Sequence, residues 1–238
     1  KFERNEMINI IEEFRQYKNE ENAEKQAAYL RHQFEFIGLK TPERRLLAKD
    51  FLKEKKADRQ IDWELVFEFW NLPEREFQYL ALDYLHQMKK WVIFDDMEKI
   101  KKLTVSKSWW DTVDALDELV GHLLLTGRKQ ATENDSTAYE QVKTLVKEWA
   151  QAENFWIRRI AIDCQLSFKN QTDLELLSYN IEKNLLGSSF ADEFFITKAI
   201  GWALRDLAKT NSAWVIKFIE EHENKMAKLS IREASKHL

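Results

Sequence analysis

Three stretches of the chain place a tryptophan one helical turn from a charged side chain. They are residues 108–114, 156–159 and 198–206. Residues three and four apart share one face of a helix, so Trp110 is expected to lie over Asp114, and Trp156 over Arg159. An electron-rich ring beside a fixed carboxylate suits a cationic guest. A deoxyribose that is losing its base is such a guest, so these stretches are the first candidates for chemistry.

In the third stretch, Trp202 is expected between Lys198 and either Arg205 or Asp206. Taken singly, each pair has a simpler interpretation, because most tryptophans of a helical protein are packing residues. The charged partners are usually solvated, which applies to Asp114 with Asp117, to Arg158 with Arg159, and to Lys198 with Arg205. Repetition favours a function, because a helical solenoid would align the three pairs on one surface.

The composition indicates an all-α protein. The 238 residues include only five glycines and two prolines, whereas Leu, Lys, Glu, Ala and Arg are abundant. The single cysteine, Cys164, sits in an apolar run and is expected to be a buried thiol, which leaves neither a disulfide framework nor a cysteine metal site. We therefore expect a reducing, cytoplasmic setting.

The charge and hydropathy patterns exclude some partners. No apolar run approaches the roughly 18 to 20 residues of a membrane span, and the first residues lack the arrangement of a signal peptide. We therefore expect a soluble monomer without a membrane partner. A formal net charge of -4, from 37 Lys and Arg against 41 Asp and Glu, argues only weakly against nucleic acid. Cations gathered on one surface can still bind phosphates.

Hydrophobic periodicity predicts the helices that must position these residues. They are 6–18, 21–36, 41–56, 62–71, 73–90, 94–104, 107–126, 136–151, 153–168, 172–186, 190–209, 211–222 and 229–237. No linker rich in Pro, Gly or Ser divides the chain, so residues 1–238 are expected to form a single domain. Helix pairs recur at 41–71, 73–104, 107–151, 153–186 and 190–222. This repetition predicts a curved solenoid of HEAT-like antiparallel helix pairs with a concave face for an elongated partner.

Several kinds of chemistry have no support in the sequence. The five histidines are scattered, and no H-E-x-x-H motif or Cys/His cluster appears, so no metal site is expected. Phosphate-binding loops, a dinucleotide fingerprint and a G-x-S-x-G motif are missing as well. We expect no cofactor.

Five segments, spread over nearly the whole chain, form a more specific pattern. They are GLKTPERR at 38–45, FW at 69–70 with PEREFQY at 73–79, SWWDTVD at 108–114, NFWIRRIAI at 154–162 and EFFITKAIGWALR at 193–205. In this order and spacing they resemble the AlkD family of HEAT-like DNA glycosylases. Enzymes of that family remove alkylated, positively charged purines from DNA.

The resemblance implies roles for particular residues. Trp110, Asp114 and Trp202 match the family's active-site aromatics and carboxylate, and Arg159 matches an arginine that contacts the DNA backbone. Trp109 and Arg158 are the neighbouring alternatives, because a shift of one residue rotates a helical side chain by about 100 degrees. Further phosphate contacts are expected at Arg44, Arg45, Lys107, Lys198 and Arg205, with Arg232 and Lys236 as secondary candidates.

The chemistry of such lesions requires few catalytic groups. A purine alkylated at N3 or N7 carries a positive charge and leaves as a neutral base, so one carboxylate can suffice without a general acid. Asp114 could stabilise the oxocarbenium-like sugar and orient or deprotonate the attacking water. Trp110 and Trp202 could flank that sugar, each contributing roughly 0.5 to 2 kcal/mol by cation–π attraction. The resemblance implies an open DNA-binding surface, with selectivity set by the lability of the lesion.

We therefore expect a monofunctional glycosylase that acts on N3- and N7-alkylpurines, of the 3-methyladenine and 7-methylguanine type, in double-stranded DNA. One alternative is a non-catalytic HEAT-type module that binds DNA or a protein on the same concave face. A separation of more than about 8 Å between Asp114 and both indoles would favour it. A second alternative is a protein-interaction scaffold, whose affinity for DNA would be negligible and insensitive to salt.

Overall fold

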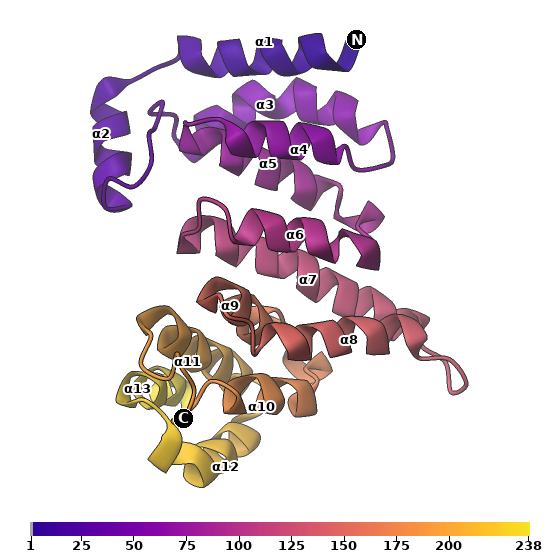
Figure 1. Cartoon of the computed structure of the whole chain (residues 1–238), viewed down its shortest axis with the longest axis vertical. Helices are drawn as coiled ribbons and strands as arrows, with labels where there is room; N and C mark the ends of the chain where they lie inside the picture. Colours follow the sequence, from indigo (N-terminus) through magenta and orange to yellow (C-terminus); the bar gives the residue numbers. More distant parts are fainter. Residues whose placement is uncertain (1) are drawn as a thin grey trace. The chain divides into compact units, whose positions relative to one another are not determined.

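The structure is a computed structural model that describes residues 2–238, and it is built of α-helices with short 3-10 turns between some of them (Figure 1). The first helices are α1 (Phe2–Gln16), α2 (Glu20–Tyr29), α3 (Thr41–Lys56), α4 (Trp63–Asn71) and α5 (Arg75–Gln87). They are followed by α6 (Met97–Thr104), α7 (Trp110–Gln130), α8 (Thr137–Trp149), α9 (Phe155–Asp163), α10 (Leu174–Glu182), α11 (Phe194–Ala208), α12 (Ser212–His222) and α13 (Lys228–Ala234). The prediction of an all-α protein is confirmed, since residues 2–238 contain no β-strand. None of their helices combines the length and the apolar character that a membrane span requires.

Several of the predicted helices are shorter than expected, among them α2, α9 and α11. α2 ends at Tyr29 instead of residue 36, and Arg31 just beyond it has a positive φ of 59° that a helix cannot contain. α9 ends at Asp163 instead of residue 168, and Ser167 has a φ of 68°. α11 begins at Phe194, four residues later than predicted, after a residue in the extended conformation. Left-handed residues other than glycine are difficult to foresee from sequence, which explains the first two errors.

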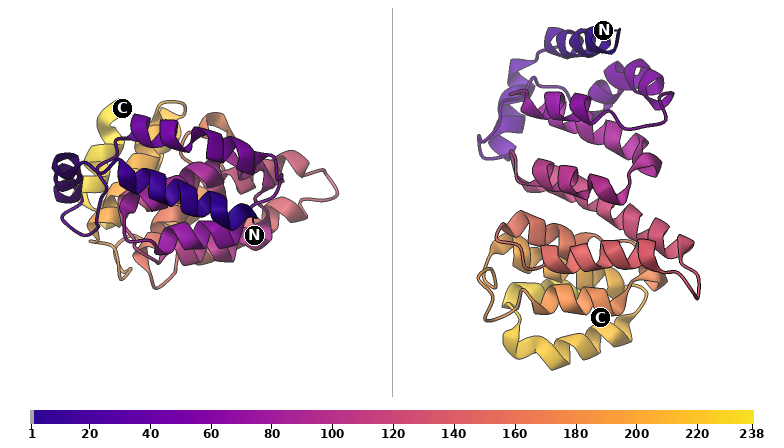
Figure 2. Two further views of the ribbon diagram at one scale, coloured as in Figure 1. Left: turned by 90° about the horizontal axis from the view of Figure 1, so that it is seen from above. Right: turned by 45° about the vertical axis from the view of Figure 1, so that its right-hand side comes forward.

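The chain separates into two compact units, Lys1–Val92 and Ile93–Leu238. In the first unit α4 and α5 lie side by side, as both Figure 1 and Figure 2 show, and α3 also packs on α5. The predicted pair 41–71 joins α3 with α4, and the predicted pair 73–104 places α5 in the next pair. The observed packing of α4 on α5 therefore joins helices from two different predicted pairs. The single domain and the concave face stay predictions.

Stacked phenylalanines form the core of the first unit. Phe77 of α5 stacks on Phe14 of α1 and on Phe69 of α4, with ring centroids 5.5 and 6.3 Å apart. Phe51 of α3 meets Phe69 edge-on at 5.9 Å. Four helices therefore contribute one ring each, and burial of each ring stabilises the fold by roughly 1.5 to 3 kcal/mol.

A buried carboxylate beside this core holds the connection between α2 and α3. Glu76, which is 0% exposed, accepts hydrogen bonds from the backbone N–H groups of Ile37 (2.9 and 3.0 Å), Gly38 (2.8 Å) and Leu39 (3.1 Å). Gly38 has a φ of 101°, and a Cβ there would lie 2.1 Å from the carbonyl oxygen of Asn19. A glycine is therefore required at the centre of this turn. The hydrogen bonds offset the cost of burying the charge.

In the second unit successive helices pack as pairs. α7 packs on α8, α9 on α10 and α11 on α12, in agreement with the predicted pairs 107–151, 153–186 and 190–222. α11 also packs on both α9 and α13 (Figure 1). Its buried face, with Ile196, Ile200 and Leu204, belongs to the hydrophobic core. Because α9 packs on both α7 and α11, side chains from these three helices can meet.

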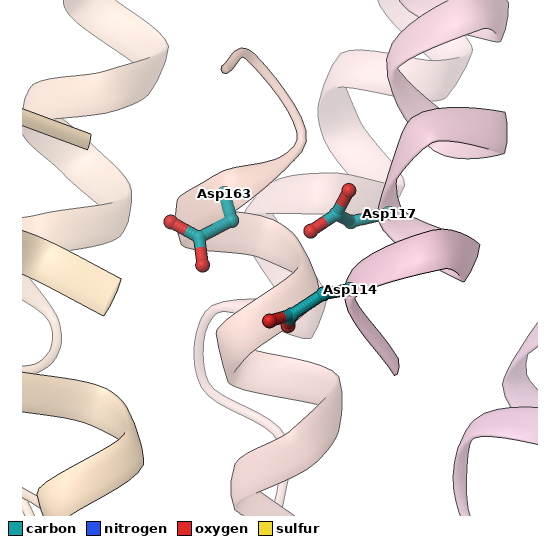
Figure 3. A group of neighbouring side chains, drawn as sticks. All are labelled: Asp114, Asp117 and Asp163. Atoms are coloured by element: carbon teal, nitrogen blue, oxygen red, sulfur yellow. The ribbon is translucent and has the colours of Figure 1, made fainter. Parts of the chain in front are cut away.

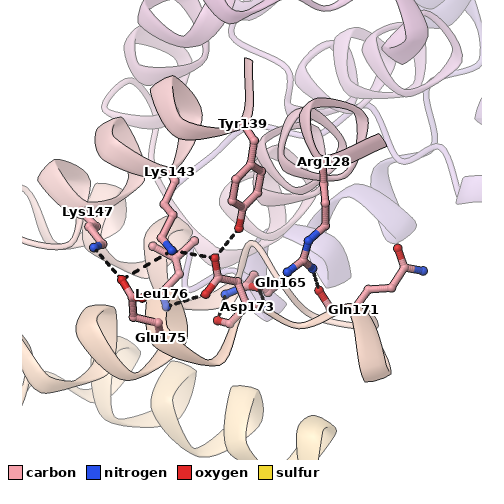
Figure 4. A network of polar contacts seen from close by, with 9 residues as sticks. All are labelled: Arg128, Tyr139, Lys143, Lys147, Gln165, Gln171, Asp173, Glu175 and Leu176. Carbon is pink, nitrogen blue, oxygen red and sulfur yellow. Dashed lines mark hydrogen bonds and ion pairs between the residues drawn. The ribbon is translucent and has the colours of Figure 1, made fainter. Parts of the chain in front are cut away.

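A polar network joins α8 to the start of α10 (Figure 4). The N-cap residue of α10 is Asp173, whose carboxylate accepts from the Tyr139 hydroxyl, from Lys143 Nζ at 2.9 Å and from the Leu176 N–H at 3.0 Å. Burial acts to raise the pKa of Asp173, but the hydrogen bonds from Tyr139, Leu176 and Lys143 outweigh it, and the pKa is lowered. The network therefore holds an ionised carboxylate.

Candidate active site

Two of the predicted site residues, Asp114 and Arg159, form a bidentate ion pair. Arg159 Nε donates to Asp114 Oδ1 at 2.8 Å, and Nη2 donates to Oδ2 at 3.0 Å. The remaining nitrogen, Nη1, donates to the carbonyl oxygen of Phe195 at 2.6 Å. The Arg159 side chain is 1% exposed, whereas that of Asp114 is 28% exposed. The pair thus presents a fixed carboxylate to solvent, with its counter-charge buried behind it.

Three helices position this pair. α7 begins at Trp110 and carries Asp114 one turn further on. α9 begins after its N-cap residue Asn154, whose side chain accepts from the Trp156 N–H at 2.8 Å, so that Arg159 falls in the second turn. The first turn of α11 supplies the carbonyl that receives the third guanidinium nitrogen. A single side chain therefore joins α7, α9 and α11.

The indole of Trp202 lies near the same guanidinium. Arg159 Cζ is 5.2 Å and Lys198 Nζ 5.8 Å from its ring centroid. The expected neighbour Lys198 is confirmed, and Arg159 is a neighbour that the sequence did not indicate. Trp110 is half-buried and lies one turn before Asp114 on the same face of α7. The structure therefore brings Asp114, Arg159 and Trp202 together, with Trp110 on the adjoining turn.

Trp109 and Trp156 belong to an aromatic cluster at the starts of the same helices. Trp156 is 6% exposed, and its ring lies 4.6 Å from Phe195 and 4.8 Å from Phe155. Trp109 contacts Phe195 at 4.9 Å and Trp156 at 5.8 Å. Trp156 is therefore a packing residue. Trp109 is the N-cap residue of α7, with an extended φ of -160°, so the helical face of Asp114 is shared by Trp110.

Two further carboxylates, missed by the sequence analysis as parts of the site, lie behind Asp114. Asp114, Asp117 and Asp163 each present an oxygen within 4.8 Å of the other two, where α7 faces the end of α9 (Figure 3). Asp117 is 4% exposed, so the expectation that it is solvated is wrong. Asp163 is 1% exposed, and among the described residues neither of its oxygens has a hydrogen-bond partner. The Nε atom of Arg159 lies 3.9 Å from its Oδ2.

Burial changes the protonation of both hidden aspartates. It raises the pKa of Asp163 to about 8, with Arg159 opposing the shift and Asp114 and Asp206 adding to it. Burial, followed by the charges of Asp163 and Asp114, also raises the pKa of Asp117 well above its ordinary range. The signal available in the sequence was an aspartate inside the apolar run 160–166, four residues after Arg159.

The predicted phosphate contacts include buried as well as exposed side chains. Arg159 has its three guanidinium nitrogens on protein acceptors and almost no exposed surface, and its contact with the DNA backbone stays a prediction. Arg44 is likewise buried, 6% exposed and 3.2 Å from Asp83, and its phosphate contact also stays a prediction. The side chain of Arg45 is 65% exposed, 3.5 Å from Asp83. Lys107 is half-buried in the turn before α7.

Lys198 and Arg205, the other predicted contacts, surround a carboxylate of α13. Glu233 is 4% exposed, and its oxygens lie 3.0 Å from Lys198 Nζ, 3.0 Å from Lys236 Nζ and 3.7 Å from Arg205 Nη1. Hydrogen bonds from Lys236 and Lys198 lower the pKa of Glu233 to about 2. The close approach depends on Gly201, where an added Cβ would lie 2.6 Å from Glu233 Cβ. Three cations share one carboxylate, so this cation cluster carries net positive charge.

A protein-family model matches nearly the whole chain, because residues 10–238 fit the family described as DNA alkylation repair enzyme. The chain belongs to this family. The chain is also similar to a solved structure described as "Predicted DNA alkylation repair enzyme from Enterococcus faecalis". The two chains are 34% identical with a TM-score of 0.79, and the match covers 93% of this chain and 96% of that chain. A comparison with curated protein sequences gave no significant match.

Proposed function

We propose that this member of the DNA alkylation repair enzyme family is a monofunctional glycosylase that hydrolyses the N-glycosidic bond of cationic N3- and N7-alkylpurines in double-stranded DNA. The observation that supports this most is the partly exposed carboxylate of Asp114, held at both oxygens by the buried Arg159. A carboxylate fixed in this way needs little reorganisation when positive charge develops on a sugar in front of it.

The lesion itself supplies a good leaving group, and the protein stabilises the sugar and positions the water. The alkylated purine takes the electron pair of the glycosidic bond and leaves as a neutral base, so no side chain has to protonate it. Asp114 stabilises the oxocarbenium-like sugar and orients the attacking water, whose proton it accepts or passes on. Both oxygens of Asp114 accept from Arg159, which fixes the carboxylate in place and favours charge stabilisation as its main role. Trp110 and Trp202 flank the sugar and attract its charge.

The DNA backbone is proposed to lie along partly exposed cations of the second unit. The cation cluster of Lys198, Arg205 and Lys236 is preorganised by the buried Glu233, which holds the three side chains near one another without neutralising them. Contacts of this kind bind phosphates of any sequence. This suits an enzyme whose selectivity comes from the lability of a cationic base.

Release of methylpurines from methylated duplex DNA tests the proposal. Asp114→Asn keeps the size of the side chain and one acceptor but removes the charge, so it is expected to lower the single-turnover rate by about 10²- to 10³-fold. Glu148→Gln is the matched control, because Glu148 is an exposed residue of α8 and has no part in the proposed site. Its rate is expected to stay within about twofold of the wild type.

Each negative outcome has a separate meaning. No methylpurine release by the wild type would exclude a glycosylase, and equal release by Asp114→Asn would exclude the proposed role of this carboxylate. Binding of the duplex that weakens with salt, without release of any base, would indicate the non-catalytic DNA-binding module instead.

A further inference from the structure

Asp117 and Asp163 have no part in the reaction described above, yet they lie against the carboxylate that does. Asp114 and Asp117 extend from α7, and Asp163 is the last residue of α9 (Figure 3). Asp163 is 1% exposed, and neither of its oxygens accepts a hydrogen bond from the described residues. An ionised carboxylate in such a place, without donors or water, is strongly unfavourable.

The guanidinium of Arg159 acts on all three carboxylates: it hydrogen-bonds Asp114, lies 3.9 Å from Asp163 and attracts Asp117 electrostatically. The Nε and Nη2 atoms of Arg159 donate to Asp114, and Nη1 donates to the carbonyl of Phe195. If all three aspartates were ionised, two negative charges would lack a counter-charge, and the two aspartates farthest from solvent would carry them. A proton on each of Asp117 and Asp163 balances the site and leaves the Asp114–Arg159 pair intact.

We propose that Asp117 and Asp163 are positioning residues for Asp114: protonated, they leave the guanidinium of Arg159 to Asp114, and ionisation of Asp163 draws it away. The geometry for this exchange is present, because Arg159 Nε lies 2.8 Å from Asp114 Oδ1 and 3.9 Å from Asp163 Oδ2. The proton that leaves Asp163 goes to solvent. Asp114 then loses part of its bidentate partner, and its carboxylate is free to rotate.

The surrounding charges determine where this exchange occurs. The groups acting on Asp163 are Arg159 of α9, Asp114 of α7 and Asp206 of α11, and those acting on Asp117 are Asp163, Asp114, Glu118 and Arg159. None of these groups comes from α6, α8 or α10, which also pack on α9. Burial and these charges together raise the pKa of Asp163 to about 8, which places the exchange just above neutral pH.

The consequence for catalysis rests on the proposed function, so the primary test needs no DNA. NMR of the protein labelled with ¹³C in its aspartate carboxyls and ¹⁵N in its arginines follows both partners against pH. The Asp163 carboxyl is expected to titrate with a midpoint near about 8, and the Arg159 Nε resonance is expected to shift with the same midpoint. Asp163→Asn should abolish both transitions, because a neutral amide cannot compete for the guanidinium.

Urea unfolding gives a second readout. The folded protein keeps a proton on Asp163 that the unfolded chain releases above about pH 4. Asp163 is therefore expected to lower the stability as pH rises from about 4 to about 8, and this residue alone raises the unfolding constant by up to about tenfold per pH unit. Asp117, whose pKa is also raised, adds to the change in the same direction. Asp163→Asn should remove the contribution of Asp163 to this slope and leave that of Asp117. Glu76→Gln, which alters a buried carboxylate of the first unit, should lower stability and leave the contribution of Asp163 to the slope in place.

In the methylpurine-release assay, the wild-type single-turnover rate is expected to fall as Asp163 ionises, whereas Asp163→Asn should hold its neutral-pH rate to about pH 9. A purely structural role of Asp163 would change the rate equally at every pH.

Three outcomes would overturn the proposal. They are an Asp163 carboxyl that titrates below about pH 5, an unfolding slope unchanged in Asp163→Asn, and carboxyl resonances displaced by one equivalent of Mg²⁺, which would make the cluster a cation site. If the wild type released no methylpurine but Asp163 titrated as expected, the proposed function would be excluded. The positioning role of the acid pair, protonated Asp117 and Asp163, would still be supported.

Discussion

Two buried carboxylates, one in each compact unit, have opposite surroundings. Glu76 in the first unit is 0% exposed and faces three backbone N–H groups at 2.8 to 3.1 Å. Asp163 in the second unit is 1% exposed, and its oxygens have no hydrogen-bond donor among the described residues. The two side chains are equally hidden, so burial alone does not separate them. The two carboxylates differ in the number of hydrogen-bond donors around them.

The difference shows how a structural carboxylate can be told from one poised for chemistry. Where donors surround the carboxylate, as at Glu76, the hydrogen bonds hold a turn together. Where donors are lacking, as at Asp163, the group keeps a proton and responds to any change in its neighbours. Asp114 lies between these extremes, with two donors from one guanidinium and an exposed edge.

The largest effect on stability is expected from replacing Glu76, the buried carboxylate that has hydrogen-bond donors. Glu76→Gln keeps one acceptor but turns an amide NH₂ toward backbone donors, so we expect the free energy of unfolding to fall by about 3 kcal/mol. Urea denaturation at neutral pH measures this. Glu64→Gln, at an exposed position of α4, is the control and should change stability by less than about 0.5 kcal/mol. Equal effects of the two variants would show that the donors around Glu76 do not matter.

A smaller loss is expected at the ion pair. Arg159→Met keeps the apolar stem and removes the guanidinium, which leaves Asp114 and the Phe195 carbonyl without their donors. Since the Asp114 side chain is 28% exposed, water can replace part of the loss, and we expect about 2 kcal/mol instead of the 3 to 5 of a fully buried pair. Arg45→Met, at a side chain 65% exposed, should cost less than about 0.5 kcal/mol in the same measurement. An unchanged stability of Arg159→Met would contradict the supporting role of the guanidinium.

The smallest effect is expected where several partners share one carboxylate. Tyr139→Phe removes one of the hydrogen bonds to Asp173, while Lys143 and the Leu176 N–H remain (Figure 4). We therefore expect a loss of about 1 kcal/mol by urea denaturation. Tyr17→Phe, at an exposed tyrosine, is the control. A loss of stability as large as that of Glu76→Gln would mean that the remaining donors to Asp173 do not compensate for the lost hydrogen bond.

Much of the fold and part of the site could be predicted because they depend on local signals. Hydrophobic periodicity predicts the helices, and a spacing of four residues places Trp110 and Asp114 on one face of α7. The proximity of Lys198 to Trp202 follows from the same rule within α11.

What the sequence did not reveal depends on contacts between distant segments. Arg159 looks like a surface cation until α9 is placed between α7 and α11, which bury it and supply its acceptors. Asp163 looks like any charge at a helix end until the same packing removes it from water. In the first unit, the packing of α4 on α5 is stabilised by the contact of Phe69 with Phe77, which periodicity within either helix does not predict.

Cys164, the only cysteine in the chain, follows Asp163 directly and is 3% exposed. Burial and the two neighbouring aspartates raise the pKa of its thiol, so a thiol reagent can react only after the end of α9 opens. The rate at which a thiol reagent labels the wild-type protein therefore measures how often the end of α9 unfolds locally beside Asp163. Each molecule that opens is recorded once, at one known atom, without substrate or substitution.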